Sequence, residues 1–152
     1  MVKTLLASLV AALVVSGLAL ATSQGETNKL NSKLKAGAEV PRPTGVPTGA
    51  TGVFTGKTVE LANDKVRLTW KLTFSHLSGK ATAAHIHLGK KGKAGGALVP
   101  LCGPCRSGQT GKALITHAQE RKIEAGLTYV NIHTTKNAAG EIRGQIKSTE
   151  VA

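Results

Sequence analysis

Apolar and polar residues alternate along several short segments of the chain. In the clearest of them, 66–74, five apolar residues at every second position face one side: Val66, Leu68, Trp70, Leu72 and Phe74. A period of two is typical of a strand that buries one of its faces. The preceding segment, 53–61, alternates for much of its length, and turn-forming residues at 62–65 connect the two. Together the two segments predict a β-hairpin.

Short extended segments with the same rhythm continue along the rest of the chain. One begins at Leu30 and ends in a loop rich in proline and glycine. The others are separated by glycine-rich turns and lie at 82–88, 97–101, 112–116, 127–134 and 141–146. A single helical turn is predicted at 117–125, where Thr116 can cap the first turn and Gly126 can end the helix. Seven or eight short strands with at most one short helix predict an all-β, antiparallel Greek-key β-sandwich or barrel.

The N-terminal residues are typical of an export signal. A short basic start and an almost wholly apolar stretch over 4–20 lead to the small residues Ala19-Leu20-Ala21. We expect a signal peptide over 1–21, a disordered leader over 22–29 and one domain over 30–148, with no membrane span after cleavage. The alternative is that the apolar stretch, near the lower length limit for crossing a bilayer, stays as an anchor. Either way we expect a secreted, periplasmic or extracellular domain.

The chain is strongly basic, with 20 Lys and Arg residues against 8 Asp and Glu residues and a formal net charge of +12. The excess is spread along the chain, with one local cluster at 90–93. Such a charge favours contact with anionic surfaces, although a generally solvated cationic surface is the simpler explanation. Specific nucleic-acid binding is not expected, because stacking of bases needs aromatic side chains and this chain has few. The expected partner is an unidentified protein or an anionic surface.

Three histidines are placed by strand parity to meet on one face of the fold. His85 and His87 lie two residues apart on an extended segment and therefore point to the same side, with Ile86 facing the core. His133 lies in a second extended segment and points outward with Tyr129 and Asn131 by the same parity. If the two strands are neighbours, the three imidazoles converge outside the sheet.

Four segments of the chain resemble, in order, the signature blocks of the CHRD domain, a family named for its occurrence in chordin and also found in secreted microbial proteins. The four blocks are 33–41, 83–89, 126–134 and 137–146. The resemblance extends over residues 30–147, nearly the whole of the expected mature chain. It implies an immunoglobulin-like or superoxide-dismutase-like β-sandwich. It implies little about biochemical activity, apart from growth-factor binding in the animal relatives.

The comparison with copper-zinc superoxide dismutases bears on the histidines. Those enzymes carry a His-x-His pair on one strand and a later His on another, and His85, His87 and His133 resemble these copper ligands in spacing and order. Strand parity turns Arg143 outward on the segment 141–146, and the resemblance implies a position near the three histidines, as an arginine that guides anions to the metal. The long loop rich in His and Asp that holds zinc in those enzymes has no equivalent here, so the bridging histidine and the zinc site of those enzymes are not expected.

Copper, or zinc, is the ion that the three histidines are expected to bind. Three neutral imidazoles suit either metal and leave a coordination position open. The alternative is a structural polar cluster, in which His85 and His133 only form hydrogen bonds across the strands. His76 and His117 are expected to be solvated or capping residues, and either could supply a fourth ligand.

Cys102 and Cys105 form a Cys-Gly-Pro-Cys sequence that has two interpretations. A thioredoxin-type redox motif needs its first thiol at a helix N-terminus, whereas the residues that follow here predict a loop. An exported chain with two cysteines most simply forms one structural disulfide, which we expect to close a tight turn. Conventional hydrolase chemistry has no support in the arrangement of acids, serines and histidines.

The sequence therefore predicts an exported binding or structural module of the CHRD type with a three-histidine surface metal site. The alternative is a copper-binding protein or copper enzyme that resembles a reduced superoxide dismutase. A binding or structural module is expected more than an enzyme.

Overall fold

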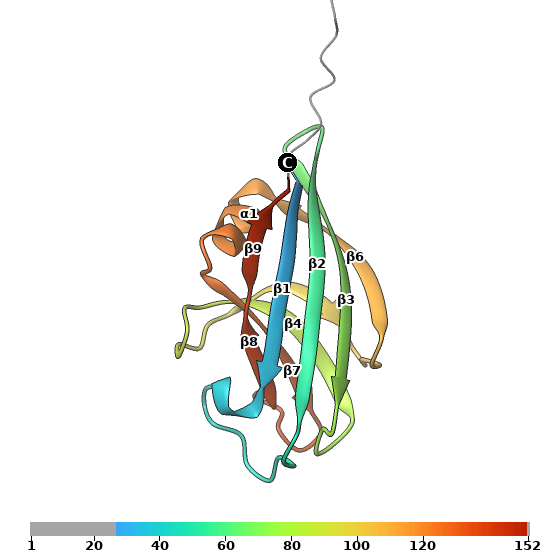
Figure 1. Cartoon of the computed structure of the whole chain (residues 1–152), viewed down its shortest axis with the longest axis vertical. Helices are drawn as coiled ribbons and strands as arrows, with labels where there is room; N and C mark the ends of the chain where they lie inside the picture. Colours follow the sequence, from blue (N-terminus) through green and yellow to red (C-terminus); the bar gives the residue numbers. More distant parts are fainter. Residues whose placement is uncertain (1–26, 152) are drawn as a thin grey trace, which may run out of the picture.

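The computed structural model describes residues 27–151, whose regular structure is mostly antiparallel strand (Figure 1). The elements are β1 (Thr27–Lys35), η1 (Ala36–Ala38), β2 (Thr51–Leu61), β3 (Lys65–Ser75), β4 (Ala81–Leu88), β5 (Ala97–Cys102), β6 (Gln109–Thr116), α1 (His117–Glu124), β7 (Thr128–Thr134), β8 (Ile142–Gln145) and β9 (Lys147–Glu150). No helix within these residues is long and apolar enough to cross a membrane. The expected signal peptide and most of the expected leader lie outside the described residues.

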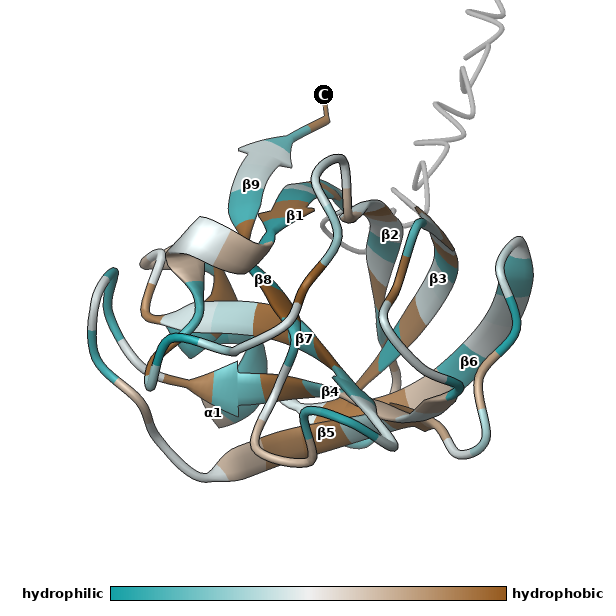
Figure 2. Cartoon of the chain, turned by 90° about the horizontal axis from the view of Figure 1, so that it is seen from below, coloured by the Kyte–Doolittle hydropathy of each residue, from teal (hydrophilic) through white to brown (hydrophobic). Residues whose placement is uncertain are grey.

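The strands form one continuous sheet in the order β5-β4-β7-β8-β1-β2-β3-β6, and β9 pairs with β1. The two outermost strands, β5 and β6, contact each other, so the sheet curls into a nearly closed barrel around a common interior (Figure 2). The all-β, antiparallel prediction is confirmed. The sheet is continuous because β1 pairs with both β2 and β8 and so joins the two halves.

The core is made by the side chains that alternate inward along these strands. In β3 the predicted inward face is buried at Val66, Leu68, Trp70 and Leu72, whereas Phe74 is only partly buried at the strand end. Ile86 of β4 and Val130 of β7 are fully buried on the same inner side. Burial of each such side chain contributes about 1.5–3 kcal/mol. The inner positions of β4 and β7 therefore anchor the two strands that carry the histidines.

The first strand begins earlier than the sequence predicts. Thr27, Asn28 and Lys29, which we expected in a disordered leader, pair with β2, and Asn28 and Lys29 also pair with β9. The Asn28 side chain is buried and donates a hydrogen bond to Glu124 at 2.7 Å. These residues are polar and carry no strand signal of their own. They are ordered because strands on both sides offer backbone partners.

Helix α1 confirms the predicted helical turn and its cap. The Thr116 side chain accepts a hydrogen bond from the Gln119 amide, and the Gln119 side chain accepts one from the Thr116 amide, which together form a capping box. Ala125 is the C-cap, and Gly126 follows with a positive φ of 66°.

Replacing Thr116 by alanine should lower the free energy of unfolding by about 1 kcal/mol, because the Gln119 amide loses its acceptor. Urea denaturation of the variant measures this, with Thr110→Ala, an exposed threonine near the start of β6, as a control. An unchanged midpoint for Thr116→Ala would show that the cap contributes nothing.

Candidate metal centre

The three histidines are brought together because β4 and β7 are antiparallel neighbours. In their register Ala83 lies opposite His133, His85 opposite Asn131, and His87 opposite Tyr129. The strands that carry the histidines are therefore neighbours, as the predicted convergence of the three imidazoles required. All three imidazoles lie on the outer face of the sheet and are partly buried.

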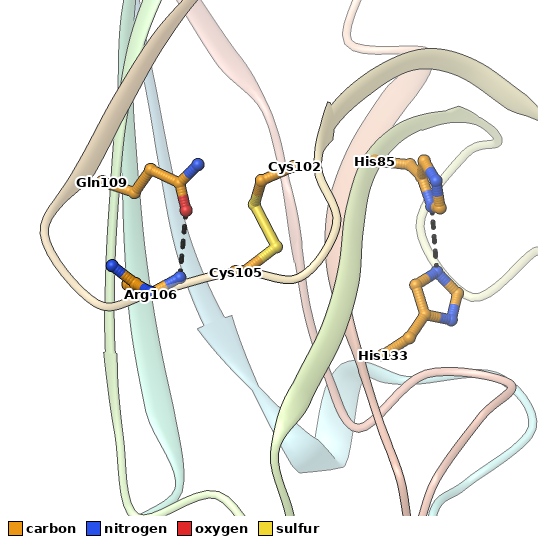
Figure 3. The surroundings of a disulfide bond; sticks show 6 residues. All are labelled: His85, Cys102, Cys105, Arg106, Gln109 and His133. Atoms are coloured by element: carbon orange, nitrogen blue, oxygen red, sulfur yellow. Dashed lines mark hydrogen bonds between the residues drawn. A yellow bond between two sulfur atoms is a disulfide. The ribbon is translucent and has the colours of Figure 1, made fainter.

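The imidazole rings are close enough to share one ion. His85 Nδ1 lies 3.2 Å from His133 Nε2, and the two rings meet edge-on across the strands (Figure 3). The ring centre of His87 lies 5.4 Å from that of His85 and 5.8 Å from that of His133. One ring nitrogen from each residue lies within 4.8 Å of the others. The three side chains thus form a single cluster.

Backbone carbonyls orient two of the three rings. His87 Nδ1 lies 2.9 Å from the carbonyl oxygen of Gly95, and His133 Nδ1 lies 2.9 Å from that of Ala138. A carbonyl only accepts hydrogen bonds, so each Nδ1 carries the proton and donates it. In the neutral ring of each residue, Nε2 is then the unprotonated nitrogen, which is the form that metal coordination requires.

The third ring completes this donor set. Because His133 Nε2 carries a lone pair, His85 Nδ1 must donate the hydrogen bond between them in the metal-free protein. If a metal ion bound here, the ring proton of His85 would move to its Nε2, and His85 Nδ1 and His133 Nε2 would both be available to hold the ion. His87 Nε2 is buried without a hydrogen-bond partner, with the Asn131 amide close by. The donor set is therefore His85 Nδ1, His87 Nε2 and His133 Nε2.

The surroundings favour the neutral form of His85 and His87. Burial lowers the pKa of His85, and the neighbouring His133 and His87 lower it further. Burial also lowers the pKa of His87, more than the hydrogen bond to Gly95 raises it. Both rings are thus more often neutral at a given pH than a free histidine, and neutral imidazole is the form that binds metal.

Arg143 lies behind the histidines, under the β4–β5 loop (residues 89–96). Its guanidinium carbon sits 3.4 Å from the centre of the Tyr129 ring, which is also stacked against His87. Its Nη2 atom donates hydrogen bonds to the carbonyls of Lys90 and Lys93, at 3.0 and 2.8 Å. Arg143 is only 1% exposed. In this position it holds the loop that carries the Gly95 carbonyl; its anion-guiding role stays a prediction.

A second buried network holds the β7–β8 loop (residues 135–141), which carries the Ala138 carbonyl. The carboxylate of Glu141, fully buried, accepts hydrogen bonds from the Ser78 amide and hydroxyl, the Thr134 hydroxyl and the Asn137 amide group. Burial raises the pKa of Glu141, but these hydrogen bonds together lower it below its ordinary value. An ionised Glu141 therefore ties both ends of the loop together.

The other two candidate ligands lie elsewhere. His76 Nδ1 lies 3.1 Å from the Ser75 hydroxyl, and His117 lies at the start of α1 among acidic side chains. Neither reaches the cluster, so a fourth ligand from these residues is not present. The sequence did not reveal the groups that orient His87 and His133. These are the backbone carbonyls of Gly95 and Ala138, and every residue has such a carbonyl whatever its side chain.

Cys102 and Cys105 form the predicted disulfide (Figure 3). Cys102 is the last residue of β5 and pairs with Ala84 of β4, beside His85. The Cys105 amide donates to the carbonyl of Ala81. The bridge closes a turn between two strands and lies at no helix N-terminus, which supports a structural role.

Comparison with known proteins identifies the family. The model of the CHRD domain matches residues 30–146, and all three histidines and Arg143 lie inside the matched region. No curated protein and no solved structure matches the chain. The matched region spans the sheet from β1 to the end of β8. The chain therefore belongs to the CHRD domain family, whose members are binding or structural modules.

Proposed function

We propose that this CHRD module is exported and binds one copper ion through His85 Nδ1, His87 Nε2 and His133 Nε2. One observation carries the proposal: three imidazole nitrogens lie within 4.8 Å of one another, and carbonyls orient two of the rings. A purely structural cluster needs only the His85–His133 hydrogen bond. It leaves His87 Nε2 buried beside the Asn131 side chain without a well-formed hydrogen bond, which a metal ion would replace.

Copper is favoured over zinc by general ligand chemistry. Nitrogen ligands bind Cu(II) more tightly than Zn(II) in the ordinary order of metal affinities, and imidazole suits both ions. Three protein ligands leave room for a water molecule or another small ligand. Export is supported by the structural disulfide, which persists in oxidising compartments, and by the signal-like residues 1–21.

Titration of the purified protein with Cu(II) and with Zn(II) tests the proposal. We expect one tightly bound copper per chain and a weaker affinity for zinc. His85→Ala and His133→Ala should each weaken copper binding by at least about 100-fold, more than the loss of an outer hydrogen-bond partner to a ligand. Electron paramagnetic resonance of the Cu(II) form should show nitrogen coupling that changes in both variants.

His76→Ala is the matched control, because it removes an imidazole that lies outside the cluster. It should leave the copper affinity unchanged. Equal, weak binding by the wild type, both cluster variants and the control would contradict the proposal. Circular dichroism of each variant establishes that a loss of binding is not a loss of folding.

A copper enzyme of the superoxide dismutase kind is the second candidate, supported by the order and spacing of the histidines. The burial of Arg143 favours a binding module or carrier instead, because the guanidinium is covered by the loop that it holds. We expect copper-loaded protein to remove superoxide no faster than the same concentration of free copper. A faster rate, lost in His133→Ala, would favour the enzyme.

A further inference from the structure

Acidic side chains gather around His117 at the end of the β2–β3 hairpin. His117 Nδ1 lies 3.3 Å from Glu60 Oε1 and 3.5 Å from Glu120 Oε2, and His117 Nε2 lies 3.5 Å from Asp64 Oδ1. Glu60 belongs to β2, Asp64 to the following turn, and the other two to α1. The elements meet there because Lys65, at the start of β3, pairs with Thr116, the residue before the helix.

The charges of this group do not balance. Three carboxylates surround one imidazole, and even a protonated His117 supplies only one positive charge. The surplus is negative in a chain whose net charge is +12. The group therefore has the electrostatic character of a cation site in an otherwise cationic protein.

Glu120 gives the second, independent sign of a missing partner. Its side chain is only 5% exposed, and its Oε1 atom is buried without a hydrogen-bond partner. A buried carboxylate oxygen without a partner is costly, and such groups are normally paired or bound to a metal. The other oxygen of the same carboxylate points at His117 Nδ1.

We propose that Glu60, His117 and Glu120 bind a divalent transition-metal ion of the zinc type, separate from the three-histidine cluster. One ligand atom from each of the three lies within 4.8 Å of the others. The nitrogen ligand is His117 Nδ1, and Glu60 and Glu120 supply oxygens. A nitrogen and two carboxylates suit Zn²⁺, whereas Ca²⁺ and Mg²⁺ prefer oxygen ligands alone.

Asp64 supplies the outer hydrogen bond that such a site needs. With a metal bound, the Asp64 carboxylate would keep the proton on His117 Nε2, and the ion would displace the Nδ1 proton, which leaves to solvent. A carboxylate that holds the far nitrogen of a ligand histidine is a recurring arrangement at zinc sites. Asp64 is thus a positioning residue, and the three others are the ligands.

This site shares no residue with the three-histidine cluster, so the two proposals can fail separately. Titration with Zn²⁺ is carried out on a His133→Ala background, which disables the cluster. We expect one equivalent of zinc to bind, with little response to Ca²⁺. Adding Glu60→Gln or His117→Gln should weaken zinc binding by at least about 100-fold, and Asp64→Asn by about 10-fold.

Glu150→Gln, which removes an exposed carboxylate on β9, is the matched control for net charge. It should leave zinc binding unchanged. Zinc should also raise the thermal midpoint of the His133→Ala protein, and Glu60→Gln should remove that increase. Glu60 is partly exposed, so this variant is expected to fold even if a change at the buried Glu120 is not tolerated.

Two results would overturn the proposal. One is that the His133→Ala protein takes up no zinc. The other is that Glu60→Gln and Glu150→Gln weaken zinc binding equally. The effect of Glu60→Gln would then come from the net charge of the protein and not from the loss of a ligand. A simple ion-pair role for His117 predicts that Glu60→Gln lowers the midpoint in the absence of zinc and leaves the zinc response intact.

Discussion

Replacing Glu141 by glutamine should lower the free energy of unfolding at neutral pH by about 3 kcal/mol, because hydrogen bonds to a charged group contribute about 1.5–3 kcal/mol each and at least two lose their acceptor. The carboxylate is fully buried and accepts from Ser78, Thr134 and Asn137. Glutamine keeps the shape but directs an NH₂ group at donors that need an acceptor. Urea denaturation measures the difference.

The pH dependence of this effect has a definite sign. The folded-state pKa of Glu141 lies below its ordinary value of 4.5, so the ionised group stabilises the fold above that pH. The contribution is lost as the pH falls from 4.5 through the lower, folded-state pKa. The difference between wild type and Glu141→Gln should therefore be largest near neutral pH and shrink in acid.

Glu39→Gln is a matched control with the opposite expectation. Glu39 is also buried, but burial raises its pKa above 4.5 despite the hydrogen bond from the Val40 amide. Its ionised form therefore lowers the stability of the fold at neutral pH, and the cost disappears as the pH falls through the raised pKa toward 4.5. Glu39→Gln should be neutral or stabilising at pH 7. Equal losses in both variants would contradict the assigned role of the Glu141 network.

Replacing Arg143 by alanine should destabilise the fold by about 3 kcal/mol and release the β4–β5 loop. The guanidinium donates to the carbonyls of Lys90 and Lys93 and lies over the Tyr129 ring. Charge-assisted hydrogen bonds and a desolvated cation–π contact of this kind contribute on the order of 1–3 kcal/mol each. Amide hydrogen exchange across residues 89–96 should accelerate together with the fall in stability.

Lys91→Ala, on the same loop, is the control for a change of charge. Lys91 is exposed, so this variant should leave both stability and exchange nearly unchanged. Copper affinity should also fall in Arg143→Ala, by about 10-fold, because the loop carries the Gly95 carbonyl that orients His87. If Arg143→Ala unfolds and exchanges like the wild type, the arginine does not hold the loop.

Local patterns in the sequence were sufficient for most of the fold. The alternation in 66–74 correctly identified the buried face of β3, since strand side chains alternate whatever the neighbouring strands are. The Thr116 cap and Gly126 identified both ends of α1, because helix ends are determined by adjacent residues. The Cys102–Cys105 spacing restricted the disulfide to one turn. Thr27 to Lys29 were mispredicted because only their strand partners order them.

The candidate sites, too, were predictable from local sequence only in part. Parity alone placed His85 and His87 on one side of a strand and His133 on the outer side of another. Arg143 was placed outward by the same parity, but nothing local showed that a loop would bury it. The grouping of Glu60 and Asp64 with His117 had no sequence signal, because these residues are brought together by the pairing of β3 with β6.

The sequence by itself determined the all-β class, the family and the direction in which His85, His87 and His133 point, because these depend on residues close together in the chain. The tertiary structure alone decided that β4 and β7 are neighbours in the register that joins the three imidazoles. It also decided which carbonyls orient them and which buried groups hold those carbonyls. Those features depend on strand pairing between distant segments, and backbone oxygens leave no trace in the identity of a side chain.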